Sequence, residues 1–584
     1  MLTGGPLGIK RIQSSHLSGG QLSGEARARP GRGAGRAAAP CRPLSGHHRV
    51  GSADRGRRTP GKRRHDRSVR QLCRGPEGHR RYPDAEIVPA ASRRPIPKMR
   101  AVARRPAAGR TEKMNVSQDL EVVVVGAGLA GLCAAVRAAE GGLRVRVIEK
   151  SPEESYLCNS RYTGGLFHVA MDDMAGDPAW VVDNIRRAMH GETDAALATT
   201  LATNARRTLA WLKQQGIRFI KAGPDGLRQN SLAPPGVRQT GLHWQGRAGD
   251  VMLRTLADVL RRRGGTLSRG VEALALVIEG GRCSGLRVRE NGVEAVLPAR
   301  AVVLADGGFQ ADMELMRRFV SPAPERLLMR NARTGSGAGL RMAEAAGAKL
   351  VGMESFYGHV QYRAAMTDER FWPYPVLDSL ATAGIVVDGA GARFCDEGLG
   401  GVHVTNAIAR LADPLSAVIV FDDTIWNGPG TDWLLPANPY LLSAGGALVS
   451  APTLDGLAEK LAIPAAAMAQ TVSAHNAAAQ GGAAVTPART TTRYKAWPIL
   501  KGPFHAVPIC AGVTYTMGGI ATDARARVLD TDGAPIPGLF AAGATTGGLE
   551  GGSRSGYSGG LSKSSVFGLI AGDTLLDQLA AKAA

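Results

Sequence analysis

The sequence has few cysteines and no long apolar run. Its seven cysteines are scattered along 584 residues, and no two of them form a CxxC or CxxCH motif. This spacing excludes an obvious zinc site, an attached c-type haem and a disulfide framework, and it predicts no metal centre. No apolar run reaches the roughly 18 residues that a membrane helix needs. We therefore expect a protein of the reducing cytoplasm with no transmembrane segment.

Net charge is nearly absent from most of the chain, although the whole sequence has a formal net charge of +22. Residues 1–113 contain 27 Lys and Arg against 7 Asp and Glu, so the other 471 residues carry only about +2. This tail is rich in Arg, Gly and Pro without apolar periodicity, and we predict that it is disordered. It fits a nucleic-acid-binding arm, a targeting peptide or a mis-assigned start. We favour a true start at Met114, directly before a strand, and expect no nucleic-acid partner.

The first informative segment, EVVVVGAGLAGLCAAVRAAEGGLRVRVIEK from Glu121, predicts a βαβ unit. Four valines predict a buried parallel strand, Gly126-x-Gly128-x-x-Gly131 leads into an Ala-rich helix, and a second strand ends at Glu149. Such glycines let a pyrophosphate approach the N–H groups of a helix N-terminus, and an acid about 20 residues further on accepts from a ribose hydroxyl. The segment predicts a dinucleotide site without distinguishing NAD from FAD.

Two later segments favour a large cofactor that lies extended. ARAVVLADGGFQAD (299–312) predicts a buried strand that ends in a Gly pair. APIPGLFAAGATTGGLEGG (534–552) predicts a strand that enters a Gly-rich turn before a terminal helix. In a chain that opens with a dinucleotide fold, this strand and turn suit FAD, with its adenosine on the first unit and its ring near the last helix.

These motifs give the chain a resemblance to a known family. From about residue 119 to 578 it resembles the FAD-dependent fumarate reductase/succinate dehydrogenase flavoproteins, and within them the tricarballylate-dehydrogenase-like branch most closely. The motifs are VVVVGAGLAG, CNSRYTGG, LADGGF, TGSGAGLRMAEAAGA, ESFYGHV, ARFCDEG, TYTMGGIATD and IPGLFAAGATTGG. The resemblance implies an α/β fold with a Rossmann-like FAD-binding domain in two segments, 114–349 and 499–584, and an inserted α+β capping domain at 350–498.

The resemblance also assigns residues to the cofactor. The ADP half is expected on Gly126, Gly128, Ala130, Gly131, Glu149 and Lys150, with Val271 at the adenine. The rest of the FAD is expected along Ser160, Thr163, Gly164, Gly165, Asp306, Gly307, Gly543, Ala544, Gly560, Leu561 and Ser562. A helix N-terminus beside the last of these would stabilise a reduced, anionic flavin. Since residues 151–167 contain no histidine, where relatives with covalently attached flavin carry theirs, we expect non-covalent FAD.

The substrate pocket departs from the fumarate reductase pattern. In this family a hydride passes between flavin N5 and a carbon beside a carboxylate or another electron-withdrawing group. His359 in ESFYGHV and Arg554 in GGSRSG match family residues that hold a substrate carboxylate. Tyr515 stands where fumarate reductases have a second histidine, and Gly401 stands where they have the arginine that donates a proton. Both replacements make the pocket less cationic and favour a larger or less charged substrate than a dicarboxylate.

Without that arginine, the acid/base group stays open among His403, Tyr357 and Tyr557. The stretch FWPYPVLDSLATAGIVVDG suits a wall over the flavin ring, and plain hydrophobic packing explains it equally well. The leading hypothesis is an FAD-dependent dehydrogenase or reductase of CH–CH groups. The alternatives are a flavin oxidase or monooxygenase of biosynthesis and a 3-ketosteroid-dehydrogenase-like enzyme with a tyrosine acid/base. The sequence has no recognisable haem or iron–sulfur ligands, so we expect a separate electron-transfer protein or a quinone-linked partner.

Overall fold

The computed structural model describes residues 120–238, 241–432 and 434–579. Its first sheet has six strands in the order β20-β21-β11-β1-β2-β7, and all neighbours except β20 and β21 are parallel. The strands are β1 (Val122–Val125), β2 (Val145–Glu149), β7 (Thr266–Arg269), β11 (Ala301–Leu304), β20 (Arg527–Leu529) and β21 (Pro535–Ala541). The four valines of β1 are all buried, as a parallel strand covered on both faces requires.

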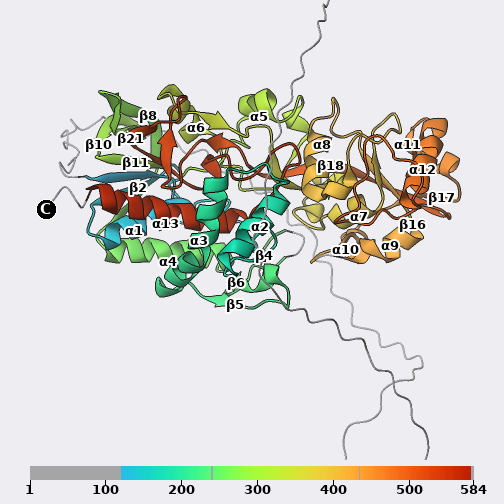
Figure 1. The fold of residues 1–584 in the computed structure, drawn as a ribbon, viewed down its shortest axis with the longest axis horizontal. Helices are drawn as coiled ribbons and strands as arrows, with labels where there is room; N and C mark the ends of the chain where they lie inside the picture. Colours follow the sequence, from blue (N-terminus) through green and yellow to red (C-terminus); the bar gives the residue numbers. More distant parts are fainter. Residues whose placement is uncertain (1–119, 239–240, 433, 580–584) are drawn as a thin grey trace, which may run out of the picture. The chain divides into compact units, whose positions relative to one another are not determined.

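Helices cover one face of this sheet (Figure 1). Helix α1 (Leu129–Glu140) packs against both α13 (Gly560–Leu579) and α4 (Ala248–Arg262), and α3 (Ala195–Gln214) packs against α13. α1 is buried over most of its surface because its small alanines let neighbouring helices approach closely. The predicted βαβ unit and the terminal helix are therefore confirmed.

The opposite face of the sheet packs against a three-stranded antiparallel sheet in the order β10-β9-β8. Its strands are β8 (Val271–Glu279), β9 (Arg282–Glu290) and β10 (Val293–Pro298). Val122 and Val124 of β1 belong to the helical core, whereas Val123 and Val125 belong to the core that includes Val288 of β9. This division follows from the alternation of side chains along a strand.

Smaller elements connect these layers. A four-stranded sheet in the order β4-β3-β6-β5 follows β2 in the chain. It contains β3 (Leu166–Val169), β4 (Asp172–Asp173), β5 (Phe219–Ile220) and β6 (Asn230–Leu232), with helix α2 (Pro178–Ala188) beside it. After β11 come α5 (Met313–Phe319), α6 (Ala338–Ala345) and the antiparallel pair β13 (Leu350–Val351) and β19 (Gly519–Ile520).

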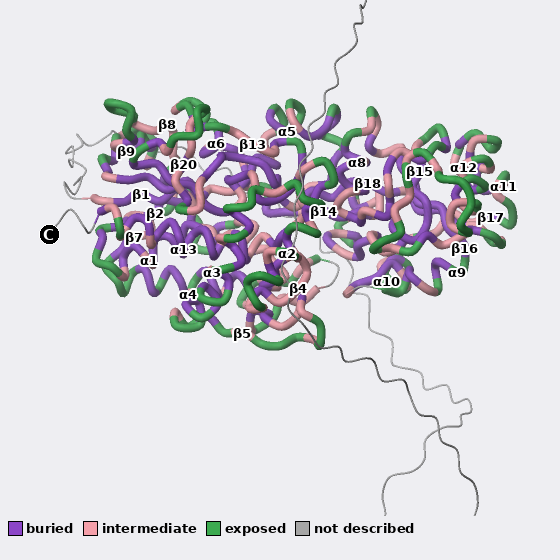
Figure 2. Tube along the Cα trace, in the orientation of Figure 1, coloured by how far each residue is buried: buried purple, intermediate pink, exposed green. Residues whose placement is uncertain are grey.

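A second large sheet has its own hydrophobic core. Its order is β12-β18-β16-β15, and β14 and β17 also pair with β18. The strands are β12 (Leu328–Met329), β14 (Phe356–Tyr362), β15 (Ile385–Val387), β16 (Val418–Asp422), β17 (Val449–Ala451) and β18 (Phe504–Thr516). The helices are α7 (Asp378–Ala383), α8 (Gly401–Ala409), α9 (Asp423–Asn427), α10 (Ala437–Ser443), α11 (Leu454–Leu461) and α12 (Ala465–Ala479). Figure 2 shows that much of the chain in the strands of this sheet is buried.

Strand β18 organises the second sheet, since it pairs with four of the other strands. It begins at Phe504, beyond residue 498, where the sequence places the end of the capping domain. The sheet therefore crosses the predicted limit between the capping domain and the second FAD-binding segment. The predicted fold class, a Rossmann-like α/β fold with an inserted α+β part, is confirmed, and the predicted tail at 1–113 lies outside the described residues.

Candidate functional site

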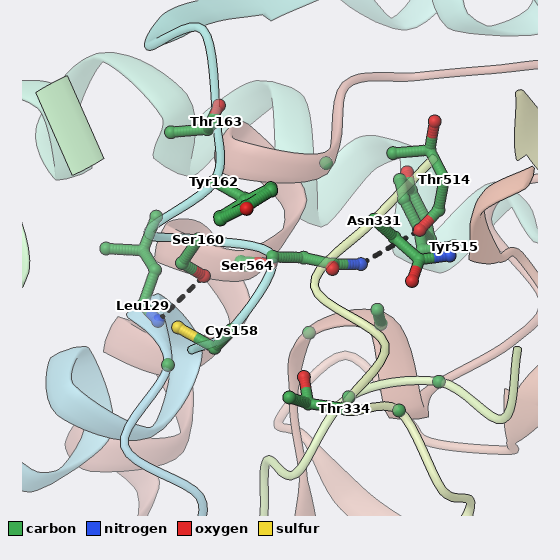
Figure 3. Close-up of a pocket in the computed structure, with 18 of the residues that line it drawn as sticks. Leu129, Cys158, Ser160, Tyr162, Thr163, Asn331, Thr334, Thr514, Tyr515 and Ser564 are labelled. Carbon is green, nitrogen blue, oxygen red and sulfur yellow. Dashed lines mark hydrogen bonds between the residues drawn. The ribbon is translucent and has the colours of Figure 1, made fainter. Parts of the chain in front are cut away.

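A cavity of about 480 Å³ opens at the carboxyl ends of β1, β2 and β11 and continues to β14 and β18 of the second sheet. The carboxyl edge of a parallel sheet is where ligands of doubly wound folds bind. Figure 3 shows part of the lining, with side chains from segments far apart in the sequence facing one space. The cavity has a nucleotide end on the first sheet and a second, aromatic end formed with the second sheet.

The glycines at the nucleotide end are required by close backbone contacts. Gly126 has φ +95°, and a Cβ there would lie 2.6 Å from the carbonyl oxygen of Ala305. A Cβ on Gly131 would collide with the carbonyl oxygen of Gly126. Gly128 is the N-cap of helix α1 and offers no side chain to cap it, and Gly128, Leu129 and Ala130 all line the cavity. This is the cradle that a pyrophosphate occupies.

Two acids flank this cradle. Glu149 accepts hydrogen bonds from the N–H groups of Ala127 (3.3 Å) and Ser151 (3.1 Å), and burial raises the pKa of its carboxyl group. Asp306 accepts from the N–H of Gly339 through Oδ2 (2.8 Å), while its buried Oδ1 has no partner among the described residues. An unpartnered buried acceptor is costly unless a ligand satisfies it. A ribose hydroxyl of a dinucleotide supplies such a donor.

The remaining predicted cofactor residues follow the same wall. Ser160 accepts from the N–H of Leu129 at 3.1 Å (Figure 3), and Lys150 donates to the carbonyl of Thr334 at 2.8 Å. The predicted residues that line the cavity are Gly126, Gly128, Ala130, Glu149, Lys150, Ser160, Thr163, Gly164, Gly165, Val271, Asp306, Gly307, Gly543, Ala544, Gly560 and Leu561. Gly131 and Ser562 do not line it: Gly131 serves close packing, and Ser562 donates to the carbonyl of His168. The cradle and the unpartnered oxygen fit FAD.

Four of the six predicted catalytic residues meet at the aromatic end: Tyr357, His359, Tyr515 and Tyr557. The rings of Tyr357 and Tyr557 stack with centroids 3.7 Å apart and planes 10° apart, and Tyr515 lies 5.6 Å from Tyr357. The Tyr357 hydroxyl lies 2.9 Å from His359 Nε2, and His359 Nδ1 lies 2.7 Å from Asp378 Oδ2. These contacts connect the cavity to a carboxylate that the sequence reasoning missed.

All three phenols are in a desolvated environment. Burial raises the pKa of Tyr357 to about 12 and raises the pKa values of Tyr515 and Tyr557 well above the ordinary value. The phenols therefore keep their protons at neutral pH and can donate hydrogen bonds. The Tyr557 hydroxyl also accepts from the N–H of Gly560 (3.2 Å), the first residue of α13.

The Tyr515 hydroxyl is held by a buried ion pair. It donates to the carboxylate of Glu550 (3.0 Å), which also accepts from the Ser558 hydroxyl (2.7 Å). Lys563 Nζ lies 3.3 Å from Glu550 Oε2, and its side chain is 1% exposed. The sequence reasoning missed both charged residues, although a lysine within the otherwise uncharged stretch GLSKSSVFGLIAG was an available signal.

Arg554 and His403 do not reach the cavity. Arg554 is exposed, and its Nη1 lies 3.4 Å from His190 Nδ1. Its turn is closed by two hydrogen bonds between Gly551 and Gly556 and is anchored through Ser553 to Glu192. This tight turn directs Arg554 outward, away from the position that the family pattern predicts. His403 lies on α8, and burial lowers the pKa of its imidazole.

Further residues that the sequence reasoning missed line the aromatic end. Arg330 donates through Nε to the carbonyl of Pro373 (3.0 Å) and through Nη1 to Thr514 (3.3 Å), and its guanidinium lies 5.1 Å from the ring centre of Tyr374. Arg238 also lines the cavity. Trp372, Pro373, Tyr374 and Val376 lie along it, and their role as a wall over the flavin ring stays a prediction.

A dinucleotide-binding α/β sheet whose cavity continues into an aromatic second half, with phenols and an imidazole at its end, is the architecture of a flavin-dependent oxidoreductase. The chain belongs to the FAD binding domain family, whose model matches residues 121–561. The predicted family and its cofactor, FAD, are thereby confirmed, and the narrower tricarballylate-dehydrogenase-like branch stays a prediction.

Comparison with individual proteins agrees with this family. The chain is 28% identical over 468 residues to NADH:fumarate oxidoreductase of Klebsiella pneumoniae (strain 342), a match that covers 78% of this chain and 47% of that protein. It therefore spans about half the length of the Klebsiella protein. It is 27% identical over 553 residues to 4-oxocyclohexanecarboxylate 2-dehydrogenase of Sinomonas cyclohexanicum, covering 79% of this chain and 93% of that protein.

Among solved structures, 3-ketosteroid Δ4-(5α)-dehydrogenase from Rhodococcus jostii RHA1 shares the fold with a TM-score of 0.59 at 23% identity, covering 80% of this chain and 98% of that chain. The two relatives from Klebsiella and Sinomonas are named an oxidoreductase and a dehydrogenase, in agreement with the predicted class. In the part of the chain that the structure describes, no helix is long and apolar enough to cross a membrane.

Proposed function

We propose that this protein transfers a hydride between FAD and a carbon–carbon bond next to a carbonyl group, with tyrosine hydroxyls as acid/base groups. One observation carries the proposal: Tyr357, Tyr515 and Tyr557 converge on the aromatic end of the cavity. Fumarate reductase chemistry is less well supported. Position 401 is glycine where the family pattern has the proton-donating arginine, and Arg554 is exposed outside the cavity.

Each tyrosine of the cavity has a separate role in this proposal. FAD, when bound, accepts or gives the hydride at its N5 atom. Tyr557 is suited to the substrate carbonyl, because it lines the cavity, its oxygen accepts from the N–H of Gly560, and its O–H, which shares a hydrogen bond with Tyr357, is the donor that a carbonyl would receive. Tyr357 gives or takes the proton on the carbon beside that carbonyl. Tyr515 donates its hydroxyl proton to a hydrogen bond with Glu550, so its role in this proposal is to hold the cavity wall in place and not to transfer a proton.

We propose a cyclic ketone or enone with at most one carboxylate as the substrate class. Trp372 and Tyr374 offer flat walls for a ring, and Arg330, whose guanidinium lies 5.1 Å from the ring centre of Tyr374, offers a cation beside those walls for an anionic group. The near full-length match to a dehydrogenase of 4-oxocyclohexanecarboxylate, a cyclic ketone with one carboxylate, supports this class. A separate electron-transfer protein or quinone-linked partner, and a cytoplasmic location, complete the proposal.

The test compares carbonyl compounds with carboxylic acids as substrates of the FAD-loaded full chain. 4-Oxocyclohexanecarboxylate and cyclohexanone are assayed with a phenazine dye as electron acceptor. Cyclohex-2-enone, fumarate and acrylate are assayed with reduced methyl viologen as donor. We expect kcat/KM for the best carbonyl compound to exceed that for fumarate by at least about tenfold, the scale of one lost charged contact. The opposite ratio refutes the proposal, and rapid reoxidation by air with peroxide formation supports the oxidase alternative instead.

A further inference from the structure

Resting on this proposed function, we propose that Tyr357, His359 and Asp378 form a proton relay that replaces the missing arginine at position 401. Tyr357 is the catalytic residue of the relay, and His359 and Asp378 are positioning residues that act through it. Tyr357 and His359 stand two residues apart on β14, and Asp378 begins α7. The relay leads from the cavity to a carboxylate whose side chain is 20% exposed.

The direction of the two hydrogen bonds follows from the chemistry of the acceptor. An ionised Asp378 can only accept, so His359 Nδ1 must carry the proton that it shares with Oδ2. In a neutral ring Nε2 then has a lone pair, and it accepts the O–H of Tyr357. Asp378 Oδ1 is fixed separately by the N–H of Val360 at 2.9 Å. The arrangement holds the imidazole in one tautomer, ready to exchange a proton with the phenol.

Gly401 makes room for this relay. It is the first residue of α8, and a Cβ there would lie 2.6 Å from Asp378 Cβ and closer still to the carboxylate. Any larger side chain at this position, including the arginine of the family pattern, would displace Asp378. The glycine that stands in place of the proton-donating arginine therefore also leaves the space that Asp378 occupies in the relay.

The proton step balances with the hydride step. When a C=C bond is reduced, Tyr357 gives its hydroxyl proton to the carbon beside the carbonyl as the other carbon receives the hydride. The phenolate that remains takes the Nε2 proton of His359, which must first have bound a solvent proton on Nε2 to form an imidazolium paired with Asp378, and the ring thereby returns to its neutral form with the proton on Nδ1. When a C–C bond is oxidised, the same proton moves in the reverse direction. Arg330, at the same end of the cavity, stabilises the transient phenolate.

The activity test breaks the relay at each member in the FAD-loaded full chain. Turnover of 4-oxocyclohexanecarboxylate is measured together with deuterium exchange at the carbon beside its carbonyl. We expect Y357F, H359A and D378N each to lower both rates by roughly 10² or more while FAD absorbance stays unchanged, since an Asp-to-Asn change in such a chain selects the wrong imidazole tautomer. Added imidazole should restore part of the H359A activity, an effect that a merely structural role would not produce.

A second His–Asp pair supplies the matched control. His505 Nε2 lies 3.0 Å from Asp423 Oδ1, and neither residue lines the cavity. D423N removes the same charge from the same kind of pair, and we expect turnover within about twofold of wild type. A deuterium exchange rate in D378N equal to that of wild type, or a loss of turnover in D423N as large as in D378N, would overturn the relay while leaving the proposed function intact.

A substrate-independent measurement separates the two proposals. In ¹⁵N spectra of the histidine-labelled protein, the signal that disappears in H359A belongs to His359. The relay requires a neutral ring with the proton on Nδ1, and D378N should change that signal whereas D423N should not. A ring protonated on Nε2 alone would overturn the relay. If wild type turns over no carbonyl compound, the proposed function fails, and this tautomer alone decides whether the hydrogen-bonded chain exists.

Discussion

A single methyl group at position 401 tests the reasoning about the site most directly. In G401A the new Cβ would lie 2.6 Å from Asp378 Cβ, and real Cβ atoms do not approach other atoms this closely. Asp378 must therefore turn away and lose its hydrogen bonds to His359 (2.7 Å) and to the N–H of Val360 (2.9 Å). Hydrogen bonds to charged groups contribute about 1.5–3 kcal/mol each, so the unfolding free energy should fall by about 3 kcal/mol or more.

The sign of this effect should depend on Asp378. In the D378G background the whole side chain that Gly401 avoids, including its Cβ, is absent, and alanine is favoured over glycine in a helix by about 1 kcal/mol. We expect G401A to lower the melting temperature and turnover of the wild type, and to leave turnover unchanged and raise the melting temperature slightly in D378G. Calorimetry of the FAD-loaded protein and the cyclic ketone assay measure both. Additive effects of G401A in the two backgrounds would refute the coupling of Gly401 to Asp378.

Three further predictions concern charges elsewhere in and around the cavity. K563M leaves the Glu550 carboxylate buried without its cation and should lower the free energy of unfolding by about 3–5 kcal/mol, much of which K563M/E550Q should recover. A K563M protein that melts like wild type would show that the ion pair contributes nothing to stability. Burial lowers the pKa of His168 to about 4, so the stability that its neutral ring contributes is present above about pH 6.5 and is lost as the pH falls towards 4. Urea titrations should therefore show that acid lowers the free energy of unfolding less in H168Q than in wild type, and an identical pH dependence of stability in the two proteins would contradict this. R554A should keep kcat within about twofold of wild type because the guanidinium is exposed, and a tenfold loss would instead mean that Arg554 reaches the substrate.

The nucleotide half of the fold could be predicted from the sequence because its determinants are local. Gly126 and Gly131 are required by backbone contacts within one strand–turn–helix unit, and the spacing records those contacts directly. Strand β18 was harder to assign, because its partners are set by distant segments. Its pairing with β14 joins residues about 150 positions apart, and no local pattern specifies which domain such a strand joins.

The same distinction explains where the predicted catalytic residues lie. Tyr357, His359, Tyr515 and Tyr557 stand on or beside regular elements whose motifs the sequence displays, and all four line the cavity. Arg554 stands in a turn whose direction is fixed by Glu192, 361 residues away, through Ser553. A motif gives the identity of such a residue without the direction of its side chain.

The departures from the fumarate reductase pattern gain a common explanation when they are considered together. Taken alone, the glycine at position 401 removes a proton donor and predicts an inactive reductase. Together with Asp378, it opens the volume in which a carboxylate fixes His359, and His359 fixes the Tyr357 hydroxyl at the cavity. A phenol with a raised pKa is a neutral donor, suited to a carbon beside a carbonyl and poorly suited to neutralising a dicarboxylate. The proposed change of proton donor and the proposed change of substrate class therefore follow from one rearrangement of side chains, centred on Asp378.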